Sequence, residues 1–489
     1  MLFNSLSFLF FFPLVTAGYF FAPPKAKVYW LLAASYYFYM CWNPVYVLLL
    51  LFVTAVSFGL SLLLSHTQDA RRRKGLFLLN IIGCLGGLFV FKYLNFFTQI
   101  LMGAAAGAGI ALKLPTFTFA AVGGISFYTF QALGYAIDVY QKKIPAEKSF
   151  SVYALFVSFF PVILSGPIER GGELIPQLKQ PHSFEYDRVC DGLFTMLWGF
   201  FKKMVIADGA AAIVNVVYGA PQDFSGPALI LATLLYAFQI YCDFSGYSDI
   251  AIGAAQVMGF TLSPNFRAPY LSASIQEFWG RWHISLSHWF RDYVYIPLGG
   301  SRRGLARTCR NLLITFLVSG LWHGASWTYL LWGLIHGAYS VAGRLTKPWR
   351  DRAKQRLRLQ GTPARLLGVL CTFCLVCLGW IFFRATSAQD GWYILTHLGT
   401  GLSTLFHAGF WEAALSPTGF FDKNGPILCA CIALLAASDI WQSAGKELPL
   451  ARKLRSKPFF FRWPVYYGLL LLILFFGNFG QSQFIYFQY

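Results

Sequence analysis

Charged residues are scarce in this sequence, and no long stretch is polar enough to form a separate soluble domain. Only 12% of its 489 residues are Asp, Glu, Lys or Arg, whereas 57% are hydrophobic. Soluble domains carry roughly twice that charged fraction. A membrane-spanning helix needs about 20 mostly apolar residues, because lipid offers the backbone no hydrogen-bond partner. The scarcity of charge therefore predicts a polytopic integral membrane protein.

Acidic residues are the scarcer of the two charged classes, with 20 Asp and Glu against 39 Lys and Arg. In a soluble protein a net charge of +19 would suggest nucleic-acid binding, but here the basic residues lie between apolar runs. The clusters are 71–74, 202–203, 302–310, 344–358 and 452–462. This is the positive-inside pattern of cytoplasmic loops. We therefore expect no nucleic-acid partner, and we expect residues 71–74 and 344–358 to be cytoplasmic.

Two further features are lacking, a basic N-terminal region and an internal repeat. Residues 1–12 carry no charged side chain, which is atypical of a cleaved signal peptide and predicts a retained first span. Counting spans back from 71–74 places the N-terminus outside. Without a repeat, an inverted-repeat transporter is disfavoured.

The ten cysteines lie mostly inside apolar runs, as Cys84, Cys371, Cys374 and Cys377 do. The last three form two overlapping C-x-x-C spacings, but their neighbours are Leu, Val, Phe and Trp. Redox chemistry or metal binding would need deprotonated thiols in a polar setting. We expect these cysteines to pack as small apolar residues and to bind no metal.

Apolar runs of spanning or near-spanning length recur along the whole chain. They cover 4–22, 28–41, 45–64, 76–103, 150–167, 190–216, 226–241, 309–343 (which we expect to form two helices), 364–383, 425–440 and 463–479. Four other segments are shorter or broken by Gly and polar residues: 104–112, 117–140, 245–260 and 273–297. Broken segments at membrane depth are tolerated where protein or a water-filled cavity surrounds them. We predict one all-α membrane domain over 1–489, with re-entrant segments lining an internal site.

Carboxylates in or beside these segments are costly unless they have a partner or a function. Asp138 is explained equally well by a site and by a structural pair with Lys142, four residues on. Glu169 and Arg170 follow a Gly-Pro turn, and we expect them to anchor it at the surface.

A second polar group occupies residues 241–253, YCDFSGYSDIAIG. Asp243 and Asp249 are six residues apart, about 120° on a helix, so they do not share one face. A paired-carboxylate acid/base site is therefore disfavoured. Hydrogen bonding between helices and lining of a polar cavity explain the cluster equally well.

Residues 276–300 are rich in both Trp and charge. Glu277 and Arg281 have the spacing of a helical ion pair. His283 and His288 would lie about 140° apart on one helix, which disfavours a shared metal ion. The tryptophans suit a helix lying near the interface or dipping partway into the membrane. At the exit, Arg302 and Arg303 either grip phosphates or anchor the topology, and we favour anchoring.

His323 lies in an apolar run between Gly320 and Gly324, next to Trp322. Small residues let another backbone or a ligand approach closely. A lone histidine in such a run is usually structural, but these neighbours favour a functional one. His336 also has a Gly neighbour but little polar company, and we interpret it as structural.

Taken together, these strings resemble the membrane-bound O-acyltransferase (MBOAT) family, in its alginate O-acetylation (AlgI-like) branch. The resemblance runs from the first span to near the C-terminus. The matching elements are ISFYTFQALGYAIDVY, FPVILSGPIER, YCDFSGYSDIAIG, NFRAPY, QEFWGRWHISLSHWFRDYVYIPLGG, GLWHGASW and GWIFFRA.

The resemblance implies a ring of about eleven or more transmembrane helices around a central catalytic tunnel, with a catalytic core at about 120–340. It assigns catalysis to His323, and a second functional role to His283. A thioester donor is already activated, so the enzyme has to deprotonate a hydroxyl and stabilise the oxyanion. We expect His323 to be the general base and His283 to orient the acceptor or donate to the carbonyl oxygen. The expected tunnel-lining residues are Trp279, Arg281, Trp322, Asp243, Tyr241, Arg302 and Arg303.

The resemblance also implies the reactants. The donor is expected to be acetyl-CoA or an acyl carrier thioester on the cytoplasmic side, with no bound cofactor. The acceptor is an exopolysaccharide such as alginate, reached with a periplasmic acetyltransferase partner at a bacterial inner membrane. Two alternatives are D-alanyl transfer to teichoic acid, within the same family, and a non-enzymatic transporter or flippase of a lipid-linked saccharide.

Overall fold

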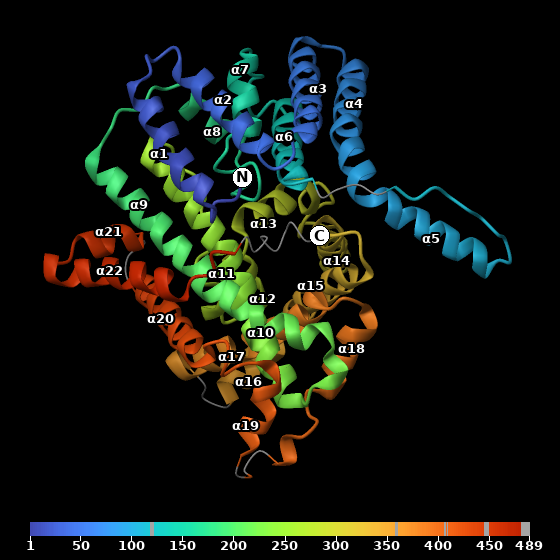
Figure 1. Ribbon diagram of the computed structural model, residues 1–489. Helices are drawn as coiled ribbons and strands as arrows, with labels where there is room; N and C mark the ends of the chain where they lie inside the picture. The colour runs from blue at the N-terminus through green and yellow to red at the C-terminus, as the bar shows by residue number, and fades with distance from the viewer. Residues whose placement is uncertain (118–121, 357–359, 405–406, 408, 445–448, 481–489) are drawn as a thin grey trace. The chain divides into compact units, whose positions relative to one another are not determined.

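The computed structural model describes residues 1–117, 122–356, 360–404, 407, 409–444 and 449–480 (Figure 1). Within these ranges the regular elements are all helical and no strand is present, which confirms the all-α expectation. Residues 118–121 of the expected segment 117–140, and 357–358 of the basic stretch 344–358, lie outside the described residues.

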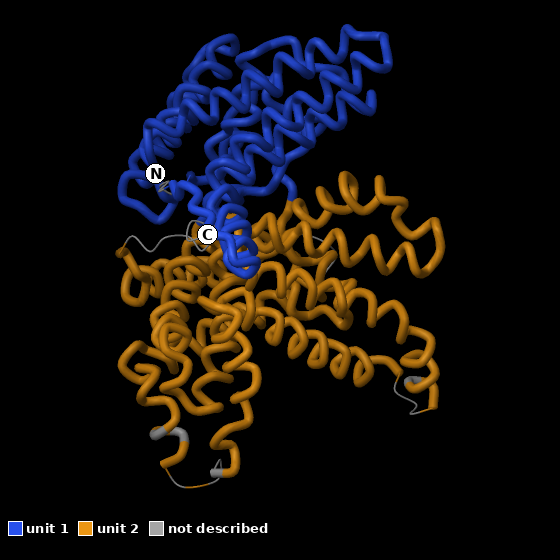
Figure 2. Tube along the Cα trace, turned by 90° about the vertical axis from the view of Figure 1, so that its right-hand side faces the viewer, with its two compact units in different colours: residues 1–196, 250–263, 486–489 blue, residues 197–249, 264–485 orange. Residues whose placement is uncertain are grey.

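The described chain forms two compact units (Figure 2). The first comprises residues 1–196 and 250–263, and the second comprises 197–249 and the described residues from 264 onward. The expectation of a single domain remains a prediction.

Helices of the first unit are 8 to 20 residues long. They are α1 (Leu6–Phe21), α2 (Lys27–Met40), α3 (Val47–His66), α4 (Ala70–Leu88), α5 (Leu94–Gly107), α6 (Ile125–Tyr140), α7 (Phe150–Ser158), α8 (Gly171–Leu178) and most of α9 (Tyr186–Phe200). Small polar side chains bridge them: the Ser57 and Tyr153 hydroxyls are 2.7 Å apart, and Asn80 donates to Ser61 at 3.2 Å. Such bonds hold membrane helices together where packing gains no hydrophobic energy.

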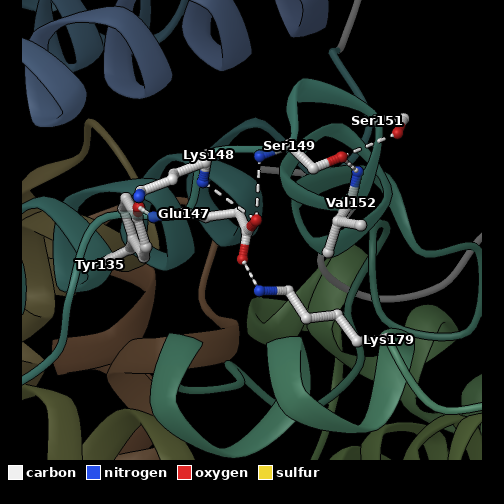
Figure 3. Close-up of polar contacts among 7 residues, drawn as sticks. All are labelled: Tyr135, Glu147, Lys148, Ser149, Ser151, Val152 and Lys179. Atoms are coloured by element: carbon white, nitrogen blue, oxygen red, sulfur yellow. Dashed lines mark hydrogen bonds and ion pairs between the residues drawn. The ribbon is translucent and has the colours of Figure 1, made fainter.

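The junction between α6 and α7 is closed by Glu147 (Figure 3). Its carboxylate accepts the backbone N–H groups of Lys148 and Ser149 at 3.0 and 2.9 Å and pairs with Lys179 just after α8. Its own N–H donates to the Tyr135 hydroxyl of α6 at 2.7 Å. One carboxylate thus fixes three helices of the first unit.

Of the two explanations for Asp138, the structure shows a structural pair, though with a different lysine, and the expectation for Glu169 is wrong. Asp138 pairs with Lys143 at 3.6 Å rather than with Lys142, because α6 ends at Tyr140 and Lys142 adopts a left-handed φ of 58° that breaks the helical spacing. Glu169 is not a surface anchor. It is 2% exposed and accepts the backbone N–H and the hydroxyl of Ser263 at 2.7 and 3.1 Å.

The second unit contains most of α11 (Gly226–Met258), the longest helix, whose residues 250–258 belong to the first unit. Its other helices are α10 (Asp208–Gly219), α12 (Ile275–Trp279), α13 (Ile284–Phe290), α14 (Leu305–His323), α15 (Trp327–Leu345), α16 (Lys347–Arg356), α17 (Gly361–Arg384), α18 (Ala388–His397), α19 (Phe410–Leu415), α20 (Gly425–Ala444), α21 (Leu450–Arg455) and α22 (Phe459–Phe476). The apolar run 309–343 forms two helices, as expected. The run 226–241 and the supposedly broken segment 245–260 are instead one helix, α11, because its polar residues find partners on neighbouring segments.

In the part of the chain that the structure describes, six helical segments are long and apolar enough to cross a membrane, and α1 is a shorter apolar helix. The six are Pro44–His66, Ala70–Gly107, Gly226–Met258, Gly361–Arg384, Gly425–Ala444 and Phe459–Phe476. They confirm an integral membrane protein.

Candidate active site

His323 ends α14, and a tight hairpin leads from it into α15. The two helices meet backbone to backbone: a Cβ atom on Gly320 would lie 2.3 Å from the Tyr329 carbonyl oxygen, and one on Gly333 would lie 2.4 Å from that of Phe316. Any side chain at either position would push the helices apart. The prediction that Gly320 admits another backbone is confirmed.

Aromatic rings enclose His323, which is 4% exposed. Its ring centroid lies 5.0 Å from those of Trp322 and Trp332, and 5.1 Å from that of Phe383 on α17. Trp332 in turn stacks on Trp380 of α17 at 6.0 Å. A site with such walls excludes bulk water, which strengthens every polar interaction made inside it.

His283 lies in the turn between α12 and α13 and is 1% exposed. Its ring meets Phe244 of α11 edge-on at 4.5 Å, and its centroid lies 6.1 Å from that of Trp322. Trp322 therefore contacts both histidines. Three of the expected site residues, His283, Trp322 and His323, are brought together although 40 positions separate the histidines (323 − 283).

The segment around His283 is not one helix. α12 ends at Trp279, His283 has φ 43° and ψ 55°, and a π-helical turn over 291–295 follows α13. The angle expected between His283 and His288 on a common helix therefore does not apply. The predicted pair between Glu277 and Arg281 is confirmed, with a distance of 2.7 Å.

Trp279 lies one aromatic ring away from His323. It contacts Trp332 at 5.7 Å and His336 at 5.2 Å between ring centroids. His336 is fully buried among these rings, and its structural role stays a prediction.

Asp243 and Tyr241 of α11 belong to a buried charge cluster. Asp243 pairs with Lys203 at 2.6 Å, and Lys203 also holds Asp208 at 2.9 Å. Tyr241 donates its hydroxyl proton to Asp439 of α20 at 3.0 Å. Both residues, which were expected to line the tunnel, thus bond to other side chains of the protein.

Lys202 and Lys203 were expected in a cytoplasmic loop, and this is wrong. Each is 4% exposed, and Lys202 pairs with Asp249 at 2.6 Å and donates to Ser245 at 3.0 Å. The cause is a π-helical turn over Phe201–Ala207, which joins α9 to α10 without a loop. The wider turn directs two successive lysines toward α11.

Arg302 and Arg303 are exposed in the turn before α14. They lie beyond its N-terminal end, whereas His323 is its last residue, so about 27 Å of helix axis separates the turn from the histidine. The structure does not bring these arginines to the histidines.

Sequence reasoning missed Asn265, in the string NFRAPY, which is 1% exposed and bonds to the two residues that follow His283. It also missed Asp439, a lone carboxylate in an apolar helix. Among the described residues, no group of three or more His, Cys, Asp or Glu is placed to hold a metal ion.

Comparison with known proteins gives concordant matches. The family model described as "MBOAT, membrane-bound O-acyltransferase family" matches residues 143–382. A probable alginate O-acetylase AlgI of Azotobacter vinelandii is 38% identical over 399 residues, covering 80% of this chain and 77% of that protein. A peptidoglycan O-acetyltransferase of Helicobacter pylori is 35% identical over 430 residues, 81% of this chain and 79% of that protein. A teichoic acid D-alanyltransferase of Bacillus subtilis is 28% identical over 271 residues, 53% of this chain and 68% of that protein.

Proposed function

Because the chain belongs to the membrane-bound O-acyltransferase family and is an O-acyltransferase, we propose that it moves an acetyl group from a cytoplasmic thioester to a polysaccharide. The observation that carries this proposal is the pair of buried histidines that share Trp322. The relatives named for O-acetylation match about four-fifths of the chain, whereas the D-alanyltransferase matches about half. Acetyl therefore fits better than D-alanyl as the group transferred.

His323 is the general base of the proposed reaction. One of its imidazole nitrogens takes the proton of the attacking hydroxyl while the oxygen bonds to the thioester carbonyl carbon. His283 donates to the oxyanion that forms or orients the acceptor. The carbon–sulfur bond then breaks, and the departing thiolate takes the proton back from His323, so the histidine ends as it began. General-base catalysis of this kind is typically worth about 10²–10⁴-fold.

The context of the reaction is part of the same proposal. The donor is acetyl-CoA or an acyl carrier thioester, and the acceptor is alginate or a related exopolysaccharide. A periplasmic acetyltransferase is its partner at a bacterial inner membrane. Further helices beside the six apolar spans complete a ring of about eleven around the tunnel.

His323→Ala tests the proposal, with acetyl transfer from radiolabelled acetyl-CoA measured in membranes of known enzyme abundance. We expect loss of most transfer at normal abundance. His323→Gln should not restore it, since an amide keeps a hydrogen bond but cannot take the proton. His66→Ala, at an exposed histidine that ends α3, is the matched control and should keep full activity.

Two results would contradict the assignment. Normal acetylation in His323→Ala would remove the general base, and it is the outcome that a transporter or flippase predicts. Low abundance of both His323 variants would indicate that the residue is structural only.

A further inference from the structure

The backbone of His283 is in a conformation that a residue with a side chain rarely adopts. Its φ of 43° and ψ of 55° are left-handed, and Lys142, Ala268 and Asn424 are the other non-glycine residues with positive φ in the described chain. Such residues persist where the surroundings hold them, and they cluster at functional sites. His283 therefore has to be held by its neighbours.

Asn265 bonds to the chain directly after His283. Its carbonyl oxygen accepts the N–H of Ile284 at 3.0 Å. Its side-chain oxygen accepts the hydroxyl of Ser285 at 2.7 Å and the N–H of the same residue at 3.3 Å. Two consecutive backbone N–H groups at the start of α13 are thus satisfied by one residue.

The chain before His283 is held by the same segment. The N–H of Arg267 donates to the carbonyl oxygen of Arg281 at 3.0 Å. Residues 265–267 therefore run beside 281–285 and bond to them on both sides of His283. Hydrogen bonds within the second unit thus hold the chain on both sides of the left-handed turn.

The amide nitrogen of Asn265 reaches α11. It donates to the Ser248 hydroxyl at 3.3 Å. Ser248 lies four residues after Phe244, so the two side chains share one face of the helix. Phe244 is the ring that meets His283 edge-on. Asn265 thus couples the backbone of His283 to the helix against which its imidazole packs.

We propose that Asn265 is a positioning residue for acyl transfer: it holds His283 in its left-handed turn so that the imidazole lies between Phe244 and Trp322. The proposal rests on the proposed function, because it assigns the geometry of a histidine used in that reaction. Because Asn265 acts through His283, its loss should lower kcat rather than donor binding.

Asn265→Ala is the test, in purified full-length protein with acetyl-CoA as donor and kcat given per folded molecule. We expect kcat to fall about 100-fold, the effect of a misplacement of about 1 Å, with donor KM within twofold of wild type. Asn265→Asp keeps the acceptor oxygen for Ser285 and should recover most of kcat. Ser285→Ala removes only the hydrogen bond of the Ser285 hydroxyl and should lower kcat to an intermediate value. This variant tests the proposal even if Asn265→Ala does not fold.

Asn80→Ala is the matched control, since Asn80 is equally buried and donates to Ser57 and Ser61 on α3. It should lower thermal stability and leave kcat unchanged. A kcat of Asn265→Ala equal to wild type, or a fall equalled by Asn80→Ala, would overturn the positioning role. If the wild type transfers acetyl and His323→Ala does not, the proposed function stands. Either of these two outcomes for Asn265→Ala then refutes the positioning role alone. Absence of transfer by the wild type refutes the proposed function instead.

Discussion

Lys203 should be among the most costly residues to replace outside the histidine site. Its ammonium nitrogen lies 2.6 Å from Asp243 and 2.9 Å from Asp208, and all three side chains are at most 6% exposed. Lys203→Met keeps most of the aliphatic volume but removes the cation that pairs with two buried carboxylates. Removing one partner of a buried ion pair costs about 3–5 kcal/mol. We expect the free energy of unfolding to fall by about that amount.

Lys347 provides a contrast at nearly the same distance. It pairs with Asp351 at 2.7 Å, but the two side chains are 70% and 51% exposed. Water screens such a pair, so Lys347→Met should cost at most about 1 kcal/mol. The comparison isolates burial as the variable.

Chemical denaturation of the detergent-purified protein, followed by Trp fluorescence, measures both free energies. A loss below about 1 kcal/mol in Lys203→Met, indistinguishable from Lys347→Met, would show that the cluster is hydrated and would refute the reasoning. Lys203→Met combined with Asp243→Asn should cost less than Lys203→Met alone. The second change removes the charge of one of the two buried carboxylates. The effects of substitutions at contacting residues on the free energy of unfolding are not additive.

Two other predictions concern the basic segments. If Arg302 and Arg303 contact donor phosphates, replacing both by Ala should raise the donor KM and weaken the dependence of KM on salt concentration. The reason is that two exposed positive charges no longer attract the phosphates. An unchanged KM would mean that the two arginines only anchor the topology. Single cysteines placed in 71–74 and 344–358 should react with an impermeant thiol reagent in inside-out vesicles and not in intact cells, and labelling of intact cells at either stretch would reverse the assigned orientation.

The sequence predicts the parts of the molecule whose signal is local. The apolar runs predict the membrane helices because burial in lipid is a property of composition. Gly320 and Gly324 predict a close approach because a missing side chain is visible in the sequence. The string around His323 predicts the site through family resemblance, and the structure brings His283 and Trp322 to it.

The failures share one physical cause, which is that the partner of a polar residue comes from elsewhere in the chain. Lys202 and Lys203 look like a loop cluster because the acids that neutralise them lie on α11 and at Asp208, beyond a π-helical turn. α11 looked broken at its polar residues for the same reason. The left-handed turn at His283 has no local signal, since it depends on bonds from Asn265.

The glycine contact between α14 and α15 also determines what can move. Where Gly320 and Gly333 bring the backbones together, no layer of side chains exists to change rotamer and absorb a shift of one helix against the other. The hairpin therefore travels as one rigid body, and His323 at its tip keeps its place relative to Trp332. By contrast, α12 and α17 meet α15 through side chains, the rings of Trp279 and Trp380, which can change rotamer when a donor enters or a product leaves.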